Sequence, residues 1–314
     1  MAVILRSAFV WLSLTTASFA ADLSIVIPTQ TGGYMVYARV FAQHLQKYTD
    51  QNVVIKAMPG AASIAAANYL YSVAPKDGSV IGMITTRAAI QFLAQPETIK
   101  YDLSKFEWIG SAVDGRKEPF VLWSKAGSQP LISGSDSASP INHISLLNSV
   151  LGWNVKEING YQNSTETKLA FEKGEINLVA YNLTGIRTTN PDWLNRSDIM
   201  PLVQYGAGNV RHPSLSLIPT VMELTKLEDD KKLIEAFERI LVLNRPFIAP
   251  PGIPAPKLAQ LRTLFEQTVT DPKHQEDAAK IGVILSPIYW HETEKIVQDM
   301  VRTPLETVSR LKQF

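Results

Sequence analysis

The sequence VVIKAMPGAASIAAANYLYSVAPKDGSVIGMI, from Val53 to Ile84, contains the signals of a complete β-α-β unit. Its β-branched beginning predicts a strand over residues 53–55. A Met-Pro-Gly break separates that strand from an alanine-rich helix predicted over residues 64–71. A Pro-Lys-Asp-Gly turn then leads into a second buried strand over residues 79–84. Because such a unit closes right-handed and joins parallel strands, the stretch predicts an α/β fold built on a parallel sheet.

The loop between the first strand and the helix of this unit is a candidate ligand contact. Ligands of open α/β sheets bind at the carboxyl ends of the strands, where helix N-termini present unpaired backbone N–H groups. The loop consists of Gly60, Ala61, Ala62 and Ser63, which are small enough for a ligand to reach the backbone. Ser63 can also cap the helix. The competing interpretation is a tight turn required for packing the helix on the sheet, and the loop alone does not decide between the two.

A second candidate loop follows the first strand of the chain, which is predicted over residues 23–27. Apolar residues at helical spacing predict a helix from Tyr34 to Tyr48 after it. The intervening loop is polar and bears two glycines; it consists of Thr29, Gln30, Thr31, Gly32, Gly33 and Tyr34. Since the carboxyl ends of parallel strands meet at one edge of a sheet, we expect the two loops to lie side by side.

A second series of alternating strands and helices begins near Leu131 and indicates a second α/β lobe. It predicts strands over residues 131–132, 155–158 and 176–181. The small, polar loop predicted over residues 133–140 contains Ser135 and Ser137, and the next loop contains Tyr161. By the same argument as in the first lobe, these loops should lie at a ligand-facing edge.

The last third of the sequence predicts a return to the first lobe. Residues 240–243 predict a strand, and the proline-rich residues 245–254 predict a rigid extended connection before a helix opened by Pro256. We expect the C-terminal helices to pack on the first lobe. The expected division is residues 21–123 with 246–314 for one lobe and residues 124–245 for the other, with an outward crossing at residues 114–118.

The first twenty residues have the pattern of a secretory signal peptide. Arg6 supplies the positive charge, residues 8–12 form an apolar core, and residues 18–20 form a small-x-small cleavage site. We expect cleavage after Ala20 and a mature periplasmic chain that begins at Ala21. The alternative, a buried N-terminal helix, is disfavoured because the segment does not alternate apolar and polar residues. No later segment approaches the ~20 apolar residues that span a bilayer.

The composition of the 314 residues excludes several classes of protein. Hydrophobic residues make up 46% and charged residues 19%, and 30 basic against 29 acidic side chains give a net charge of +1. Because no basic stripe is present, we expect no nucleic-acid partner. The chain has no cysteine, which excludes disulfides, thiolate nucleophiles and cysteine metal sites. Stability must therefore come from core burial, which a chain of this length can supply.

The sequence also lacks the common signatures of catalysis. The five histidines show no spacing typical of a zinc site; they are His44, His143, His212, His274 and His291. Neither a hydrolase nucleophile elbow nor a phosphate-binding P-loop is present. We therefore expect a protein that is not an enzyme, with no catalytic residue, metal or cofactor. His143 is expected on a helix as a packed or surface residue.

Five segments, in order along nearly the whole mature chain, carry a family resemblance. They are Gly32-Gly33-Tyr34 with Tyr37-Ala38-Arg39; Met58-Pro59-Gly60-Ala61 with residues 66–71 and 74–78; Gly160-Tyr161 with residues 173–177; residues 218–220 with 223–224; and residues 249–254 with 261–262 and 271–272. Together they resemble the TctC-like (Bug) extracytoplasmic solute receptors of tripartite tricarboxylate transporters. The resemblance implies a type II-like Venus flytrap, a two-lobe α/β periplasmic binding protein whose lobes are joined by crossing strands and close over a small carboxylate. It further implies membrane permease subunits as partners, and we expect a monomer.

In that family, recognition is largely through backbone amides and ordered water. Carried over by position, this implicates Thr29, Gln30, Thr31, Gly32, Gly33, Tyr34, Gly60, Ala61, Ala62, Ser63, Ser135, Ser137 and Tyr161 as ligand-binding residues. Two positions depart from the family pattern: Met35 replaces a frequent acidic residue and Asn163 a frequent glycine. With Met35 in place, nothing in the first loop can pair with an ammonium group. We therefore expect a carboxylic acid without an amine.

Two arginines could add a bidentate clamp for a carboxylate. Arg87 and Arg187 each lie a few residues beyond the end of a predicted strand. The competing interpretation for each is a surface arginine, because most charged residues are exposed.

Three functions remain open from the sequence. The leading hypothesis is a transport receptor that delivers a small carboxylate to a permease. The second is an orphan receptor that presents a carboxylate to a membrane sensor kinase, and the third is an exported hydrolase on an α/β scaffold. Genome neighbourhood separates the first two, and turnover assays on ester and phosphate panels test the third.

Overall fold

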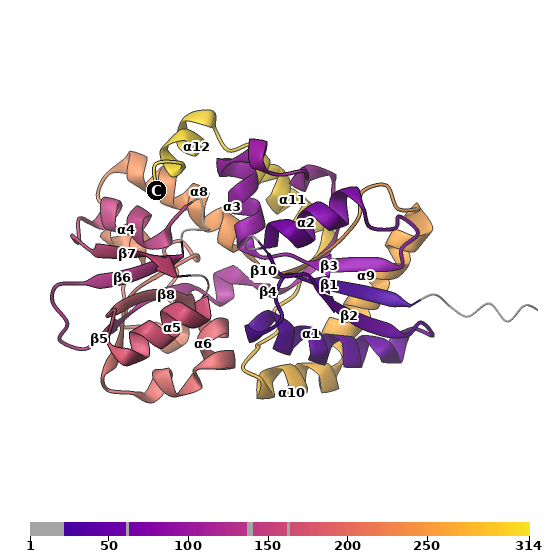
Figure 1. The fold of residues 1–314 in the computed structure, drawn as a ribbon, viewed down its shortest axis with the longest axis horizontal. Helices are drawn as coiled ribbons and strands as arrows, with labels where there is room; N and C mark the ends of the chain where they lie inside the picture. The colour runs from indigo at the N-terminus through magenta and orange to yellow at the C-terminus, as the bar shows by residue number, and fades with distance from the viewer. Residues whose placement is uncertain (1–21, 61–62, 137–140, 162–163) are drawn as a thin grey trace, which may run out of the picture.

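The computed structural model describes residues 22–60, 63–136, 141–161 and 164–314 of the chain. Its strands form one six-stranded and one five-stranded sheet. Figure 1 shows the two sheets in separate halves of the molecule, each flanked by helices. The predicted α/β class with two lobes is therefore confirmed. The signal peptide and its cleavage site lie outside the described residues.

The six-stranded sheet has the order β11-β4-β10-β3-β1-β2. Its strands are β1 (Leu23–Ile27), β2 (Val53–Ala57), β3 (Val80–Met83), β4 (Glu107–Asp114), β10 (Leu243–Ala249) and β11 (Ile288–Tyr289). Strand β1 pairs in parallel with both β2 and β3, so the predicted β-α-β unit is confirmed with β1 inserted between its two strands. Strand β10 runs antiparallel to β3 and β4.

The five-stranded sheet has the order β7-β6-β8-β5-β9. Its strands are β5 (Phe120–Lys125), β6 (Ile132–Asp136), β7 (Lys156–Tyr161), β8 (Leu178–Asn182) and β9 (Ile199–Tyr205). Strand β6 is parallel to β7 and β8, whereas β5 is antiparallel to β8 and β9. Each half therefore combines parallel strands, whose carboxyl ends share an edge, with strands that connect the halves.

The helices flank both sheets. They are α1 (Gly32–Leu45), α2 (Ile64–Ser72), α3 (Thr86–Ala94), α4 (His143–Leu151), α5 (Ser164–Lys173), α6 (Leu183–Thr189), α7 (Val221–Leu224), α8 (Glu228–Leu241), α9 (Ala255–Thr270), α10 (Pro272–Lys280), α11 (Trp290–Val301) and α12 (Leu305–Leu311). Helices α9 and α11 contact β4, and α10 contacts α1, as expected for C-terminal helices on the first lobe, whereas α12 contacts α8 as well as α3. Helix α2 packs closely on β3 because residue 82 is glycine: a Cβ there would lie 2.2 Å from Cδ1 of Leu70.

The chain crosses between the sheets twice. The outward crossing runs from β4 to β5 through a 3-10 turn, Gly115–Lys117, inside the predicted crossing at 114–118. The return crossing runs from α8 into β10. The two crossings touch through their backbones, because Gly115 N donates to Val242 O at 2.7 Å. A Cβ on Gly115 would lie 2.0 Å from Leu241 O, so only glycine permits this approach.

The predicted strand over residues 240–243 is wrong, because α8 continues to Leu241. Its buried residues Leu233, Ile234, Phe237, Ile240 and Leu241 repeat at helical spacing. The extended connection predicted over residues 245–254 is wrong for its first half, since β10 continues to Ala249 in the middle of the sheet. Pro246 is tolerated there beside a register shift between Phe247 and Ile248.

Two loops predicted in the second lobe begin later than expected. Strand β6 extends to Asp136 and β7 to Tyr161, so residues 133–136 and 159–161 are strand rather than loop. Gly134 explains the small residues of β6: a Cβ there would lie 2.6 Å from Cε2 of Tyr161. Gly134 therefore makes room for an aromatic ring rather than forming a turn.

The largest apolar core continues across both halves, and we call it the shared apolar cluster. It includes Val26 and Leu70 of the first lobe, Leu122 and Leu147 of the second, and Phe237 of α8. Two smaller clusters lie between the first sheet and α1 and α9, and around Trp123 and Phe171 in the second lobe. None of the helices in the described part of the chain is long and apolar enough to cross a membrane.

Candidate functional site

The loop after β1 ends in a helix N-terminus that no side chain caps. Thr31 is the N-cap residue of α1, with extended backbone angles and no side-chain hydrogen bond into the helix. The hydroxyl of Thr29 donates instead to the carbonyl of Thr31 at 2.8 Å. The first turn of α1 carries no acidic residue, and Gly32 is left-handed with φ +79°. The backbone N–H groups of this turn and the helix dipole therefore favour an anion.

The loops after β2 and β3 lie beside this helix N-terminus. Met58 N donates to Ile27 O at 2.8 Å, which holds the start of the second loop against the end of β1. The expectation that Ser63 caps α2 is wrong, because Ser63 has φ 90° and makes no side-chain cap. Its hydroxyl accepts from Thr85 N at 3.1 Å and so ties the second loop to the third. Ala61 and Ala62 lie outside the described residues.

Thr85 is a candidate residue that sequence reasoning missed. It is the N-cap residue of α3, and its buried hydroxyl has no hydrogen-bond partner among the described atoms. An unpaired buried hydroxyl at the carboxyl end of a parallel strand is available to a ligand or water. Its position just after a buried strand was the available signal. The same signal had already selected the loops after β1 and β2.

The second-lobe candidates are only partly described. Ser135 lies in β6, whereas Ser137 lies outside the described residues. Tyr161 ends β7, and its half-buried ring packs over Gly134 and against the second-lobe core. Burial raises the pKa of the Tyr161 hydroxyl, and Glu175 adds to the rise.

A buried ion pair occupies the junction between the lobes. Nη1 of Arg187 in α6 donates to both carboxylate oxygens of Glu118, each at 2.6 Å. The side chains are 17% and 3% exposed, so the interpretation of Arg187 as a surface residue is wrong. Thr184 Oγ1 also donates to Glu118 at 3.2 Å. Burial raises the pKa of the Glu118 carboxyl, and the charge of Arg187 opposes that rise.

Arg245 lies next to this ion pair and was also missed, because it fell in the predicted proline-rich connection. It is 2% exposed and left-handed, with φ 67°. Its Nη1 donates to Oδ1 of Asn244 at 3.0 Å, and its guanidinium lies 4.5 Å from the centroid of the Tyr34 ring. Asn244 in turn donates to Thr184 at 3.5 Å. A polar chain thus runs from Arg187 of the second lobe to Tyr34 of the first.

His143 packs among aromatic rings at the start of α4. His143 begins α4, is half-buried, and shares a 3.0 Å hydrogen bond between Nδ1 and the hydroxyl of Tyr205, which confirms it as a packed residue. Burial lowers its pKa to about 3, and the charge of Arg87 contributes. Arg87 itself is half-buried in the first turn of α3.

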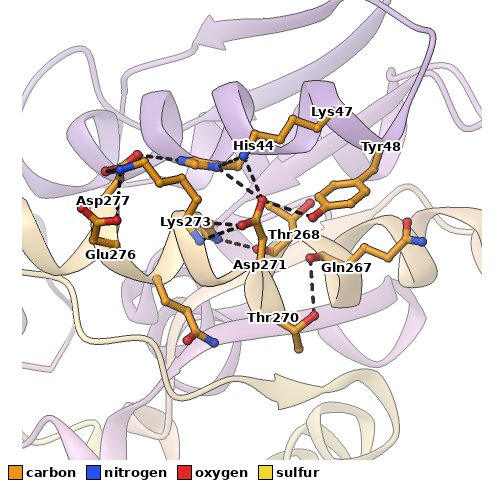
Figure 2. Close-up of polar contacts among 12 residues, drawn as sticks. His44, Lys47, Tyr48, Gln267, Thr268, Thr270, Asp271, Lys273, Glu276 and Asp277 are labelled. Carbon is orange, nitrogen blue, oxygen red and sulfur yellow. Dashed lines mark hydrogen bonds and ion pairs between the residues drawn. The ribbon is translucent and has the colours of Figure 1, made fainter.

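Figure 2 shows a second polar cluster, where the end of α1 and the following turn meet the start of α10. His44 Nε2 lies 3.2 Å from Asp277, while Lys47 and Tyr48 donate to Asp271 at 3.0 and 3.1 Å. The fold also brings His44 and His274, distant in sequence, to a ring separation of 5.1 Å. Within the described ranges, no group of three or more metal-ligating side chains is arranged to hold an ion.

Solved structures with similar architecture are solute-binding proteins. The adipate-bound protein Rpa4515 of R. palustris is 19% identical over 93% of this chain and 97% of its own, with a TM-score of 0.68. MatC from Rhodopseudomonas palustris, solved with malate, is 16% identical over 93% and 98%, with a TM-score of 0.67. A TctC solute binding protein from Polaromonas, without ligand, is 14% identical over 95% and 98%, with a TM-score of 0.62.

No protein-family model and no curated protein matches this sequence. At these identities the structural likeness concerns the fold. The fold is that of the two-lobed solute-binding proteins. More particularly, it is the fold of the TctC-like (Bug) receptors, which agrees with the resemblance in the sequence.

Proposed function

We propose that this chain is an exported receptor that captures a small organic carboxylate between its lobes and delivers it to the permease of a tripartite tricarboxylate transporter. The observation that carries the proposal is the uncapped N-terminus of α1, which lies beside the loops after β2 and β3. Such an arrangement stabilises a carboxylate through backbone N–H groups and a helix dipole.

The ligand class is supported by the solved proteins of the same fold. MatC carries malate and Rpa4515 carries adipate, and both ligands are dicarboxylates without an amine. This matches the expectation drawn from Met35, which leaves the first loop of this chain without a partner for an ammonium group.

The proposed lobes follow the sheets. The expected boundaries after residues 123 and 245 would divide β5 and β10, so we assign residues 22–114 and 243–314 to the first lobe and residues 120–242 to the second. The proposed contacts in the first lobe are residues 29–34 and 60–63, to which we add Thr85. Those in the second lobe are Ser135, Ser137 and Tyr161.

A thermal-shift screen tests the ligand class. The panel contains malate, adipate, citrate and benzoate, with aspartate and glutamate as amine-bearing matches and the diamides as neutral controls. A ligand at a hundredfold excess over its Kd stabilises the folded state by roughly 2.7 kcal/mol, so a true ligand raises the melting temperature measurably. Tighter binding of aspartate or glutamate than of the amine-free acids would contradict the assignment, as would stabilisation by the diamides alone.

Small-angle scattering tests the closing mechanism. A ligand that contacts loops of both lobes can do so only when the lobes approach, so the radius of gyration should fall when the best acid of the panel is added. Scattering curves that superpose with and without a bound acid would contradict closure. The diamide of the same acid serves as the control.

Export and delivery need separate tests. Mass spectrometry of the periplasmic fraction should show a chain that begins at Ala21, and an intact Met1 would contradict export. Uptake of the bound acid should require both this protein and a permease encoded beside it. Binding without permease-dependent uptake, together with a neighbouring two-component pair, would favour presentation to a sensor kinase instead.

A further inference from the structure

Arg245 is a buried cation without a carboxylate partner. It is 2% exposed, and among the residues described no Asp or Glu oxygen lies within ion-pair distance of its guanidinium. Its Nε has no hydrogen-bond partner, and Nη1 donates to the neutral amide of Asn244. A buried charge in proteins is normally paired, because removing it from water is costly.

The surrounding polar chain has an excess of positive charge. It contains two guanidinium groups, of Arg187 and Arg245, and one carboxylate, of Glu118. Glu118 is already committed to Arg187 through two hydrogen bonds of 2.6 Å. These three groups together therefore carry a net charge of +1 that one anionic group would neutralise. Burial lowers the pKa of the Arg245 guanidinium, and the opposing influences of Tyr34, Tyr37 and the charge of Glu118 do not reverse that fall.

The unpaired guanidinium lies beside the uncapped helix N-terminus. A Cβ on Gly33 would lie 3.0 Å from Nη2 of Arg245 and 3.6 Å from Cγ2 of Thr188 in α6. Gly33 belongs to the first turn of α1, whose backbone N–H groups have no side-chain cap. The absence of a side chain at Gly33 leaves the guanidinium and these donors directly adjacent. Helix α1 of the first lobe contacts α6 of the second close to Arg245, so parting the lobes would open this contact.

We propose that Arg245 is the charge partner of the captured acid, with one ligand carboxylate lodged between its guanidinium and the N-terminus of α1. This inference rests on the proposed function, because it assigns the group that recognises the acid. A planar guanidinium can bind a carboxylate through two parallel hydrogen bonds, whereas it repels an ammonium group. The residue therefore selects acids over amides, esters and amines.

Calorimetry on three variants tests the role of Arg245 in binding. Arg245→Gln removes the charge, Arg245→Lys keeps the charge but loses the planar fork, and Arg302→Gln removes an exposed charge as the matched control. With the best acid of the panel as ligand, Arg245→Gln should weaken binding about ten- to a hundredfold. Arg245→Lys should lose less, and Arg302→Gln should bind as the wild type. Equal affinity in Arg245→Gln and the wild type would overturn the inference.

Unliganded stability distinguishes ligand recognition from a structural role. Because Arg245 has no carboxylate partner, Arg245→Gln should melt at or above the wild-type temperature. If the charge of Arg245 were required for folding instead, Arg245→Gln should melt at a lower temperature than the wild type. Formate should raise the melting temperature of the wild type and of Arg302→Gln more than that of Arg245→Gln. Formamide, its neutral analogue, should affect the melting temperatures of the three proteins equally. If Arg245→Gln does not fold, Arg245→Lys and the wild-type response to formate against formamide decide the question.

The two proposals fail in different ways. A wild type that responds to none of the panel acids overturns the carboxylate receptor. A wild type that binds an acid which Arg245→Gln binds equally well overturns only the role of Arg245. A wild type without a specific response to formate also overturns the role of Arg245.

Discussion

Lowering the pH from 7 to 5 should destabilise this protein through His274. The ring is fully buried between the rings of Tyr37, Phe41 and His44. Its Nδ1 lies 2.7 Å from the carbonyl of Thr268, so Nδ1–H is the donor, and Nε2 has no partner among the described atoms. Protonation would place an N–H without an acceptor at Nε2.

Burial lowers the pKa of His274 to about 4, from an ordinary value of 6.5. The folded state therefore binds the proton less readily than the unfolded state, and the associated stability is complete above pH 6.5 and lost as pH falls towards 4. The full effect is about 3 kcal/mol, of which about 2 kcal/mol is lost by pH 5. Protonation of Asp271, whose pKa lies well below its ordinary range beside Lys47, affects stability only at lower pH.

Urea unfolding at pH 7, 6 and 5 measures this effect. The comparison is His274→Gln, which can keep a hydrogen bond to Thr268 and does not titrate. Groups remote from this ring, including His143, titrate equally in both proteins, so they cancel in the difference. The wild type should lose about 2 kcal/mol more than His274→Gln between pH 7 and pH 5. Parallel pH profiles for the two proteins would refute the reasoning.

Three further predictions concern the candidate site, the lobe junction and the β-α-β unit of residues 53–84. Ala62→Leu should abolish binding of the best acid without changing the far-ultraviolet circular dichroism spectrum, because bulk denies the carboxylate its approach; unchanged affinity would exclude this loop. Glu118→Gln should reduce the free energy of unfolding by about 3–5 kcal/mol, since it leaves Arg187 buried and unpaired; a loss below 1 kcal/mol would contradict this. Gly82→Ala should cost about 1–3 kcal/mol in urea unfolding, because the new methyl group would lie 2.2 Å from Leu70; an unchanged free energy of unfolding would contradict this.

The sequence predicted the elements that depend on local signals. The strand of residues 23–27, the helix after it and the β-α-β unit all follow from periodicity and turn residues, and the structure contains each of them. The errors arose where tertiary packing overrides those signals. Ile240 is β-branched and Leu241 is apolar, but both complete the buried face of α8. Pro246 argued against a central strand, yet the register shift beside it accommodates the ring.

The candidate site was predictable only in part for the same reason. Loops after parallel strands could be found from the order of the elements, which led to residues 29–34 and 60–63. Thr85 could have been found in the same way. Arg245 could not, because its importance comes from burial and from the lack of a carboxylate around it, and neither quantity is visible in a linear sequence.

The shared apolar cluster makes the two sides of the lobe junction energetically unequal. On the side of α3, α4, α8 and α12, which Figure 1 places above the sheets, parting the lobes would expose apolar surface at roughly 25 cal/mol per Å². On the side of α1 and α6, parting them exposes polar groups that water can solvate. We therefore expect the apolar side to act as a fixed pivot and the polar side as the mouth. Solvent, and the acid with it, would enter beside Arg245 rather than past the C-terminal helices.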